Sequence, residues 1–262
     1  MYPILFKIGP FALHTFSVLH GLAFVAGAWW AYREAKRLGI DPQRILDLSV
    51  LIFVWSLVGA RIFSILFDGS LQWYLQHPFD VFAVWKGGLT FYGGFLFSIP
   101  AGIWYLKKYK LDFWLTADMI APGLALGGAI GRLGCFASGD SFGKPTTLPW
   151  AVTFSDPHGL APTGVSLHPT QLYSVITNLL VFATLLWWRK RQKTDGSLFL
   201  VYLLLYAVTR SFVEIFRNDP RGVYLGGVLS TSQIISILIA IAAVVLIFLR
   251  RKDFLKQPEA LK

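Results

Sequence analysis

Seven long apolar stretches divide this chain, and they constrain its fold more than any other feature. Each is about 20 residues long, which is the length an α-helix needs to cross the hydrocarbon core of a bilayer. They lie at about 14–33, 46–67, 89–106, 114–135, 170–188, 196–216 and 229–249. Only 15% of the 262 residues are charged, whereas a soluble domain carries about 25%. The sequence therefore predicts an all-α, polytopic membrane protein with about seven transmembrane helices.

The stretches differ in how strongly apolar they are. The sixth and seventh are the clearest, whereas the third contains Gly93, Gly94 and Pro100, and the fourth contains Asp118 and Pro122. A weakly apolar span usually faces protein or a polar cavity, because lipid would penalise its polar groups. We therefore expect the third and fourth spans to face protein.

Basic residues between the spans predict the orientation of the chain, because loops rich in Lys and Arg face the cytoplasm. Sixteen of the 24 Lys and Arg residues fall on one side, namely Arg33, Lys36, Arg37, Arg44, Lys107, Lys108, Lys110, Arg189, Lys190, Arg191, Lys193, Arg250, Arg251, Lys252, Lys256 and Lys262. The N-terminus is thus expected outside and the C-terminus in the cytoplasm. The net charge of +10 then reflects topology and attraction to anionic membrane lipids, and we expect no nucleic-acid partner.

This pattern predicts a single integral membrane domain over residues 1–262, with a cytoplasmic basic tail at 250–262. Two extracytoplasmic loops are expected at about 68–88 and 136–169. The first contains an expected interfacial helix at Leu71–Leu75, and the second is rich in Gly, Pro, Ser and Thr, as substrate-contacting loops often are. Positive charges follow the first apolar stretch, so we interpret it as a retained helix and not a signal peptide.

Arginines within the spans are the most informative residues for function. An arginine at mid-helix costs about 3 kcal/mol in a membrane, so it usually has a polar cavity and a partner. Arg61 lies in the second span, Arg132 near the outer end of the fourth, and Arg210 well inside the sixth. These positions predict a polar site within an otherwise apolar bundle.

The sixth span carries a polar stripe. At helical spacing, its members fall within a sector of roughly 80°, and they are Tyr206, Arg210, Glu214 and Arg217. One interpretation is an internal Arg210–Glu214 ion pair that neutralises itself. The other is an anion site, because two arginines outnumber one glutamate.

The fourth span carries Gly123, Gly127 and Gly131, a spacing that lets another helix approach closely. Ordinary helix packing explains these glycines. Arg132 and the Gly-rich segment 133–143 follow directly. A Gly-rich backbone beside a guanidinium is also suited to cradle a phosphate group.

Other reactive residues point to no further chemistry. The five histidines show no metal-ligand spacing, and Cys135 is the only cysteine, so no disulfide or Cys-based metal site is expected. We interpret His20 as a hydrogen-bonded interior histidine. No cofactor and no metal ion are predicted.

Several blocks together resemble the bacterial prolipoprotein diacylglyceryl transferases. The segment from Gly131 to Gly143 is similar to the family's signature around a phosphatidylglycerol-binding arginine. The blocks His168–Tyr173 and Tyr206–Arg217 also resemble the family, as do Gly59–Arg61 and Gly87–Gly94. With seven spans and an external N-terminus, the resemblance covers nearly the whole chain.

The resemblance implies transfer of a diacylglyceryl group from phosphatidylglycerol to the lipobox cysteine of a preprolipoprotein, with release of glycerol phosphate, in the bacterial cytoplasmic (inner) membrane. The residues it implies for catalysis are Arg132, Arg210, Tyr92 and Glu214. Those it implies for substrate binding are Arg132, Arg210, Arg61, Gly139, Asp140, Gly143, His168, Gln171 and Tyr206.

The chain departs from the family pattern at a few positions. Tyr92 stands where the family usually has a histidine, and Cys135 and Ser138 stand where it usually has asparagines. Phe16 likewise stands where the family commonly has a tyrosine, and Asp140 and Ser174 each stand where it often has a glutamate. Two alternatives therefore stay open, a diverged non-catalytic binder of anionic phospholipids and a small-anion transporter. The absence of an internal repeat disfavours an inverted-repeat transporter.

Overall fold

The computed structural model describes residues 2–9, 11–67, 71–82, 88–192, 194–218, 223–224 and 229–250. Its contacts divide the chain into two compact units. Unit 1 comprises Met1–Trp30 and Ala117–Lys262, and unit 2 comprises Ala31–Thr116. The single membrane domain expected from the sequence stays a prediction.

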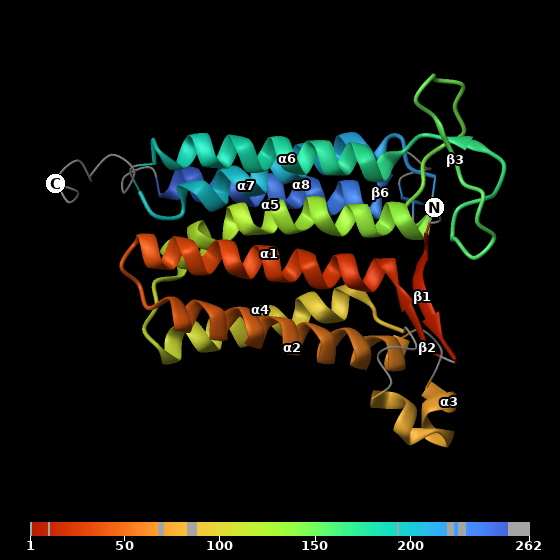
Figure 1. Cartoon of the computed structure of the whole chain (residues 1–262). Helices are drawn as coiled ribbons and strands as arrows, with labels where there is room; N and C mark the ends of the chain where they lie inside the picture. The colour runs from red at the N-terminus through yellow and green to blue at the C-terminus, as the bar shows by residue number, and fades with distance from the viewer. Residues whose placement is uncertain are drawn as a thin grey trace. The chain divides into compact units, whose positions relative to one another are not determined.

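Seven helices of 18–26 residues dominate the described part of the chain (Figure 1). They are α1 (Thr15–Arg37), α2 (Pro42–Phe67), α4 (Phe91–Lys108), α5 (Phe113–Ser138), α6 (Thr170–Arg189), α7 (Ser197–Glu214) and α8 (Thr231–Leu249). Each overlaps one of the seven apolar stretches. The helical prediction for all seven is therefore confirmed.

Five of these helices, α2, α5, α6, α7 and α8, are long and apolar enough to cross a membrane. Together with the helical fold, they define a multi-pass membrane protein. The total of seven spans and the sides of the termini stay predictions. The sixth stretch is not among the clearest, because α7 has a mean hydropathy of 1.4 whereas α2 reaches 2.2 and α8 2.8. In α5, half of the apolar window is buried inside the protein, the largest share of the five, as expected of a helix that faces protein.

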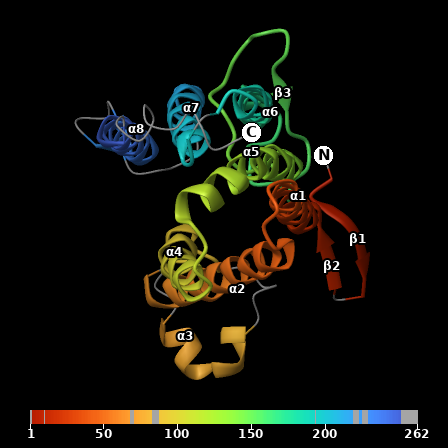
Figure 2. The same cartoon turned by 90° about the vertical axis from the view of Figure 1, so that its left-hand side faces the viewer.

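In unit 1, α6 packs on α7, and α7 packs on α8 (Figure 2). The backbones of α5 and α1 approach each other closely, since a Cβ atom on Gly123 would lie 2.8 Å from the carbonyl oxygen of Gly27. A Cβ on Gly127 would similarly lie 2.9 Å from the carbonyl oxygen of Ala23. The glycine spacing of the fourth span thus serves helix packing.

A buried carboxylate ties α5 to the beginning of α7. Asp118 accepts hydrogen bonds from the backbone N–H groups of Gly196 and Phe199, at 2.6 and 2.7 Å. It also accepts one from Nε2 of Gln192, at 2.6 Å. Asp118 is only 4% exposed, and it satisfies backbone donors at a helix N-terminus, where a negative charge is also favoured by the helix dipole.

In unit 2, α2 packs along α4 through glycine contacts. A Cβ atom on Gly59 would lie 2.4 Å from the carbonyl oxygen of Gly93, so only glycine allows this approach. The short helix α3 (Leu71–Gln76) and the 3-10 helix η1 (Pro78–Phe82) follow α2. The helix expected at Leu71–Leu75 is confirmed.

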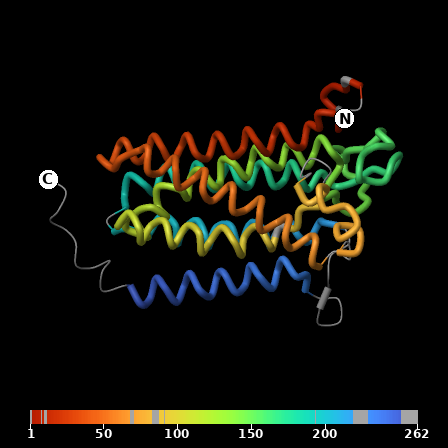
Figure 3. Tube along the Cα trace, turned by 90° about the horizontal axis from the view of Figure 1, so that it is seen from below, coloured from red at the N-terminus to blue at the C-terminus, as the bar shows by residue number. Residues whose placement is uncertain are grey.

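Three two-stranded sheets complete the described structure, and they were not expected from the sequence. They pair β1 (Ile4–Ile8) with β2 (Phe11–His14), β3 (Val152–Thr153) with β4 (Ser166–Leu167), and β5 (Val223–Tyr224) with β6 (Leu229–Ser230). The N-terminal hairpin and the segment 139–169 lie at the same end of unit 1 (Figure 3).

Some predicted boundaries change, and others cannot be assessed. The second loop begins at 139 and not at 136, because α5 continues to Ser138. Within the expected loop 68–88, the structure describes 71–82 and 88; Gly87 lies outside the described residues. Lys193 also lies outside them, as does the basic tail beyond Arg250.

Candidate functional site

Backbone contacts join the segment after α5 to the segment after α7. Gly143 forms an antiparallel β-bridge with Arg217. On either side of it, the N–H of Lys144 donates to the carbonyl of Phe216 at 2.8 Å, and that of Asn218 donates to the carbonyl of Phe142 at 3.2 Å. Two blocks that are about 70 residues apart in the sequence are thereby fixed side by side.

The block that begins at His168 joins the same junction. A Cβ atom on Gly143 would lie 2.4 Å from the carbonyl oxygen of His168, so a glycine is required there. Thr170 Oγ1 donates to the carbonyl of Ser141, and Gln171 Nε2 donates to that of Asp140, both at 2.7 Å. Gln171 Oε1 is buried and accepts no hydrogen bond from the described residues. Three of the five blocks that carry the family resemblance therefore meet in unit 1.

The polar stripe of α7 forms a buried ion cluster. Arg210 Nη1 lies 2.7 Å from Glu214 Oε2, and Arg217 Nε lies 3.7 Å from the same oxygen. The three side chains are 11%, 5% and 4% exposed, in the order Arg210, Glu214 and Arg217. The internal ion pair of the first interpretation is therefore present. Since α7 ends at Glu214, the placement of Arg217 on the same helical stripe was wrong, although its side chain still reaches Glu214.

The Arg210–Glu214 contact is an ion pair without a well-aligned hydrogen bond. Arg210 Nη1 and Glu214 Oε2 are both buried, and neither has a hydrogen-bond partner of good geometry. Arg210 Nη2 donates to Ser232 Oγ at 2.7 Å, and Ser230 Oγ donates to Glu214 Oε1 at 3.0 Å. One buried guanidinium N–H group thus keeps the capacity to bind another acceptor.

Arg132 belongs to the same electrostatic cluster but has no carboxylate partner among the described residues. Its Nη1 is 3.4 Å from Ser141 Oγ, and Arg132 and Arg217 are both close enough for their charges to act on Arg210. The cluster thus combines three guanidinium groups with the carboxylate of Glu214. An excess of positive charge in a half-buried site favours an anionic ligand.

Asp140 is the second carboxylate beside the cluster. The buried Cys135 thiol is close enough to feel the charges of Asp140, Arg132 and Arg217. Gly139, with φ +72°, precedes this aspartate, and a Cβ atom there would lie 3.1 Å from the backbone nitrogen of Ala161. The turn after α5 therefore needs glycine and presents Asp140 near the arginines.

His168 and Tyr206 occupy the edges of the cluster. His168 Nδ1 is 3.1 Å from the hydroxyl of Tyr173, which also accepts a hydrogen bond from Trp150 Nε1 at 2.8 Å. The His168 ring packs on Phe216, with centroids 5.2 Å apart. Tyr206 packs on Tyr202 one turn along α7 and interacts electrostatically with Arg210.

Two of the predicted site residues, Arg61 and Tyr92, belong to unit 2. Arg61 is 5% exposed. Its Nε donates to the carbonyl of Val81 and its Nη1 to that of Gly88, both at 3.0 Å, and its Nη2 donates to the carbonyl of Asp80. These bonds hold the chain that follows α3. Tyr92, on the first turn of α4, is 54% exposed.

His20 differs from its prediction in one respect. Its Nδ1 lies 2.9 Å from the carbonyl oxygen of Phe16, so the expected hydrogen bond is present. The ring stacks on Phe16 and lies near Gly131 and Gly134. The side chain is nevertheless exposed and not interior, because these glycines leave room for the ring beside α5 without covering it.

Sequence reasoning missed the partners that α8 and its preceding strand supply. Ser230 and Ser232 bind Glu214 and Arg210, and neither was a candidate. The motif Ser230-Thr231-Ser232-Gln233 forms a capping box at the start of α8, and this signal is visible in the sequence. It locates the helix start but not the ion pair that the serines contact.

Fold and site together define a multi-pass membrane protein with a buried, net cationic cluster at one end of a helical unit. Residues 3–249 match the family described as prolipoprotein diacylglyceryl transferase. A relative from Oceanobacillus iheyensis, named phosphatidylglycerol–prolipoprotein diacylglyceryl transferase, is 33% identical over 94% of this chain and 87% of its own length.

A relative with the same name from Trichormus variabilis is 34% identical over 95% of this chain and 91% of its own length. Another from Mannheimia succiniciproducens is 34% identical over 95% of this chain and 94% of its own length. The chain belongs to the prolipoprotein diacylglyceryl transferase family.

Proposed function

We propose that this protein transfers the diacylglyceryl group of phosphatidylglycerol to the thiol of a prolipoprotein's lipobox cysteine. The thiol sulfur forms a thioether bond with the glyceryl carbon that bears the phosphate. The C–O bond to phosphate breaks, glycerol phosphate leaves with the bonding electrons, and the thiol proton passes to a base. This is the first step of bacterial lipoprotein maturation.

The observation that carries the proposal is the cluster in which Arg210 and Arg217 contact Glu214 and the charge of Arg132 acts on Arg210. The leaving phosphate passes from one negative charge towards two, so nearby guanidinium groups stabilise the transition state more than the bound lipid. Arginine suits this role because it stays charged when desolvated and binds phosphate oxygens through a planar fork. Arg132 supplies the charge without a carboxylate partner, and Arg210 supplies the unused N–H group.

The other predicted residues take supporting roles in this proposal. Glu214 orients Arg210, and the turn from Gly139 to Gly143 shapes the site around the phosphate. Gln171 holds that turn through the carbonyl of Asp140, and His168 and Tyr206 border it. Tyr92 orients the lipid or donates a hydrogen bond, because a tyrosine is a poor base near neutral pH.

Asp140, Glu214 and His20 are the remaining candidates for the proton acceptor. Asp140 acts electrostatically on the Cys135 thiol together with Arg132 and Arg217. This position beside the arginines supports it as a candidate base next to the phosphate site.

We further propose that the protein crosses the bacterial inner membrane seven times, with the N-terminus outside. The basic residues at the helix ends support this orientation. The cluster would then lie near the outer leaflet, where a secreted prolipoprotein presents its cysteine.

The test is to supply the purified protein with phosphatidylglycerol labelled in its headgroup glycerol and a lipobox peptide. Labelled glycerol phosphate should appear together with a diacylglyceryl-modified peptide. A peptide with serine in place of the lipobox cysteine is the matched control. Phospholipid binding without release of glycerol phosphate would favour a non-catalytic lipid binder instead.

A further inference from the structure

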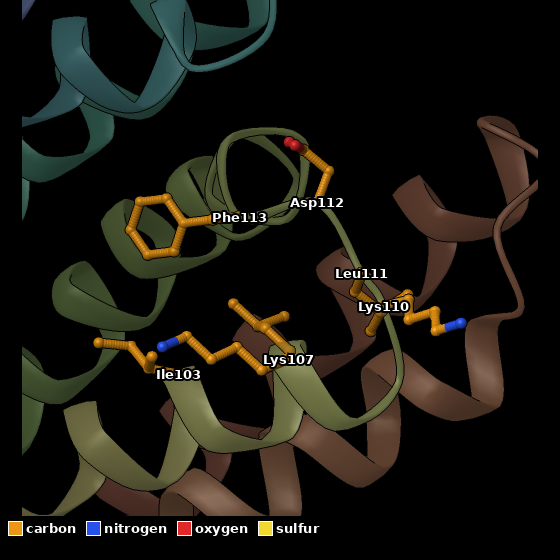
Figure 4. Close-up of a pocket in the computed structure, with 7 residues that line it drawn as sticks. Ile103, Lys107, Lys110, Leu111, Asp112 and Phe113 are labelled. Atoms are coloured by element: carbon orange, nitrogen blue, oxygen red, sulfur yellow. The ribbon is translucent and has the colours of Figure 1, made fainter.

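A cavity of about 540 Å³ lies in unit 2, where α4 turns into α5 (Figure 4). It is lined by Ile103, Leu106, Lys107, Lys110, Leu111, Asp112 and Phe113. None of these residues belongs to the arginine cluster, so the cavity is not part of the proposed transferase site. Its lining combines apolar side chains with two ammonium groups.

The turn that forms this cavity has the hydrogen bonds of a Schellman motif. The N–H of Leu111 donates to the carbonyl of Leu106 at 2.9 Å, and that of Lys110 donates to the carbonyl of Lys107 at 3.3 Å. Lys110 occupies the left-handed position with φ +53°, where glycine is usual because a Cβ atom costs about 1 kcal/mol. The chain thus keeps a lysine where helix termination alone would favour glycine.

Two arginines of this unit have a counter-charge, whereas the two lysines of the cavity have no ion pair among the described residues. Arg37 pairs with Glu34 at 2.6 Å, and Arg44 lies 3.6 Å from Asp41. Among the described residues, neither Lys107 nor Lys110 makes an ion pair, and Asp112 caps α5 by accepting from the N–H of Leu115 at 2.7 Å. In the described part of the chain the two lysines therefore have no ion-pair partner, and with the carboxylate of Asp112 the cavity lining keeps a net positive charge.

Residues typical of a membrane interface lie beside the cavity. Arg44, at the beginning of the apolar helix α2, stacks on Tyr109 at 4.6 Å, so the end of α4 is beside the start of α2. Lys108 stacks on Trp104 at 4.8 Å. Amphipathic aromatic rings and lysines are typical of the interface between headgroups and acyl chains.

From these observations we infer that the cavity binds an anionic phospholipid of the leaflet where α4 ends. Lys107 extends towards Ile103, and its ammonium group lies beside that side chain, whereas Lys110 extends from the other side of the turn (Figure 4). The lipid phosphate contacts Lys107, and an acyl chain lies against Ile103 and Phe113. The apolar lining favours a lipid over free phosphate, which would gain nothing from these side chains.

Photo-crosslinking of the full-length protein in phosphatidylcholine nanodiscs tests this inference. The probe is phosphatidic acid with a diazirine on one acyl chain, and mass spectrometry locates the labelled residues. We expect labelling of Ile103 and Phe113, about fivefold weaker in Lys107→Gln and preserved in Lys107→Arg. Ile103→Trp, which narrows the cavity and keeps the charge, should also weaken labelling.

Lys36→Gln is the matched control, because Lys36 is an exposed lysine in the last turn of α1. Its labelling should stay within twofold of the wild-type protein. Equal labelling by a diazirine phosphatidylcholine would overturn the inference, and so would an equal loss in the two glutamine variants. Displacement by inorganic phosphate at the concentration of the lipid would indicate a phosphate site instead. The inference does not depend on transferase activity, which is assayed separately.

Discussion

Two groups of buried or partly buried arginines in this protein are satisfied in different ways. Arg61 in unit 2 gives Nε, Nη1 and Nη2 to backbone carbonyls of the chain that follows α3. Among the described residues, the one hydrogen-bond partner of Arg132 in unit 1 is a serine hydroxyl, and Arg210 has a buried Nη1 without a well-aligned acceptor. Burial of an arginine in a membrane protein therefore does not by itself indicate a ligand. The difference lies in whether its N–H groups have acceptors within the protein. An arginine whose N–H groups are all satisfied there is structural, and one with N–H groups left over can bind a ligand.

Removal of either arginine that we propose to bind the lipid phosphate should have the largest effect. We expect Arg132→Ala and Arg210→Ala each to lower the transfer rate at least about a hundredfold, because each removes a donor from the developing phosphate charge. Release of labelled glycerol phosphate measures the rate. Arg132→Lys keeps the charge but loses the planar fork, so its transfer rate should lie between those of the wild type and Arg132→Ala.

Arg191→Ala is the control for loss of charge, since Arg191 is exposed and stacks on Trp187. It should leave the rate nearly unchanged. Full turnover by either alanine variant of the cluster would refute the assignment of that arginine.

Arg61→Ala should act mainly on stability. The variant leaves three carbonyl acceptors without a charged donor, which should lower the free energy of unfolding by about 3 kcal/mol. A lower thermal midpoint in detergent should accompany a transfer rate, per folded molecule, within about fivefold of the wild type. An unchanged midpoint with a hundredfold slower rate would place Arg61 among the ligand-binding arginines.

Tyr92→Phe should have a smaller effect than the alanine variants of Arg132, Arg210 and Arg61. It removes one hydroxyl group from a half-exposed side chain, so the transfer rate should fall by about threefold. A loss as large as that of Arg132→Ala would give Tyr92 a direct role in the chemistry. Tyr92→His, which restores the residue usual in the family, separates the contribution of a ring nitrogen from that of the hydroxyl.

The helices could be predicted from the sequence because their signals are local. A stretch of about 20 apolar residues indicates a helix wherever it occurs, and the spacing of Gly123 and Gly127 predicted close packing without naming the partner helix. The Arg210–Glu214 pair was also visible, since four residues separate them on one helix.

The remaining features depend on contacts between distant segments. The bridge between Gly143 and Arg217 requires two loops to meet, and no periodicity encodes that meeting. The N-terminal hairpin was missed because Ile4–Ile8 lacks a clear alternation, although Gly9-Pro10 is a turn signal. The role of Arg61 could not be predicted because its acceptors are backbone carbonyls, which every residue possesses.

The contacts of Asp118 have a consequence for biogenesis. Its three donors follow it by 74 to 81 positions in the chain. During synthesis, α5 therefore emerges from the ribosome with an acidic group whose partners have not yet been translated. The complete set of hydrogen bonds that ties α5 to the start of α7 can therefore form only after residue 199 has been translated.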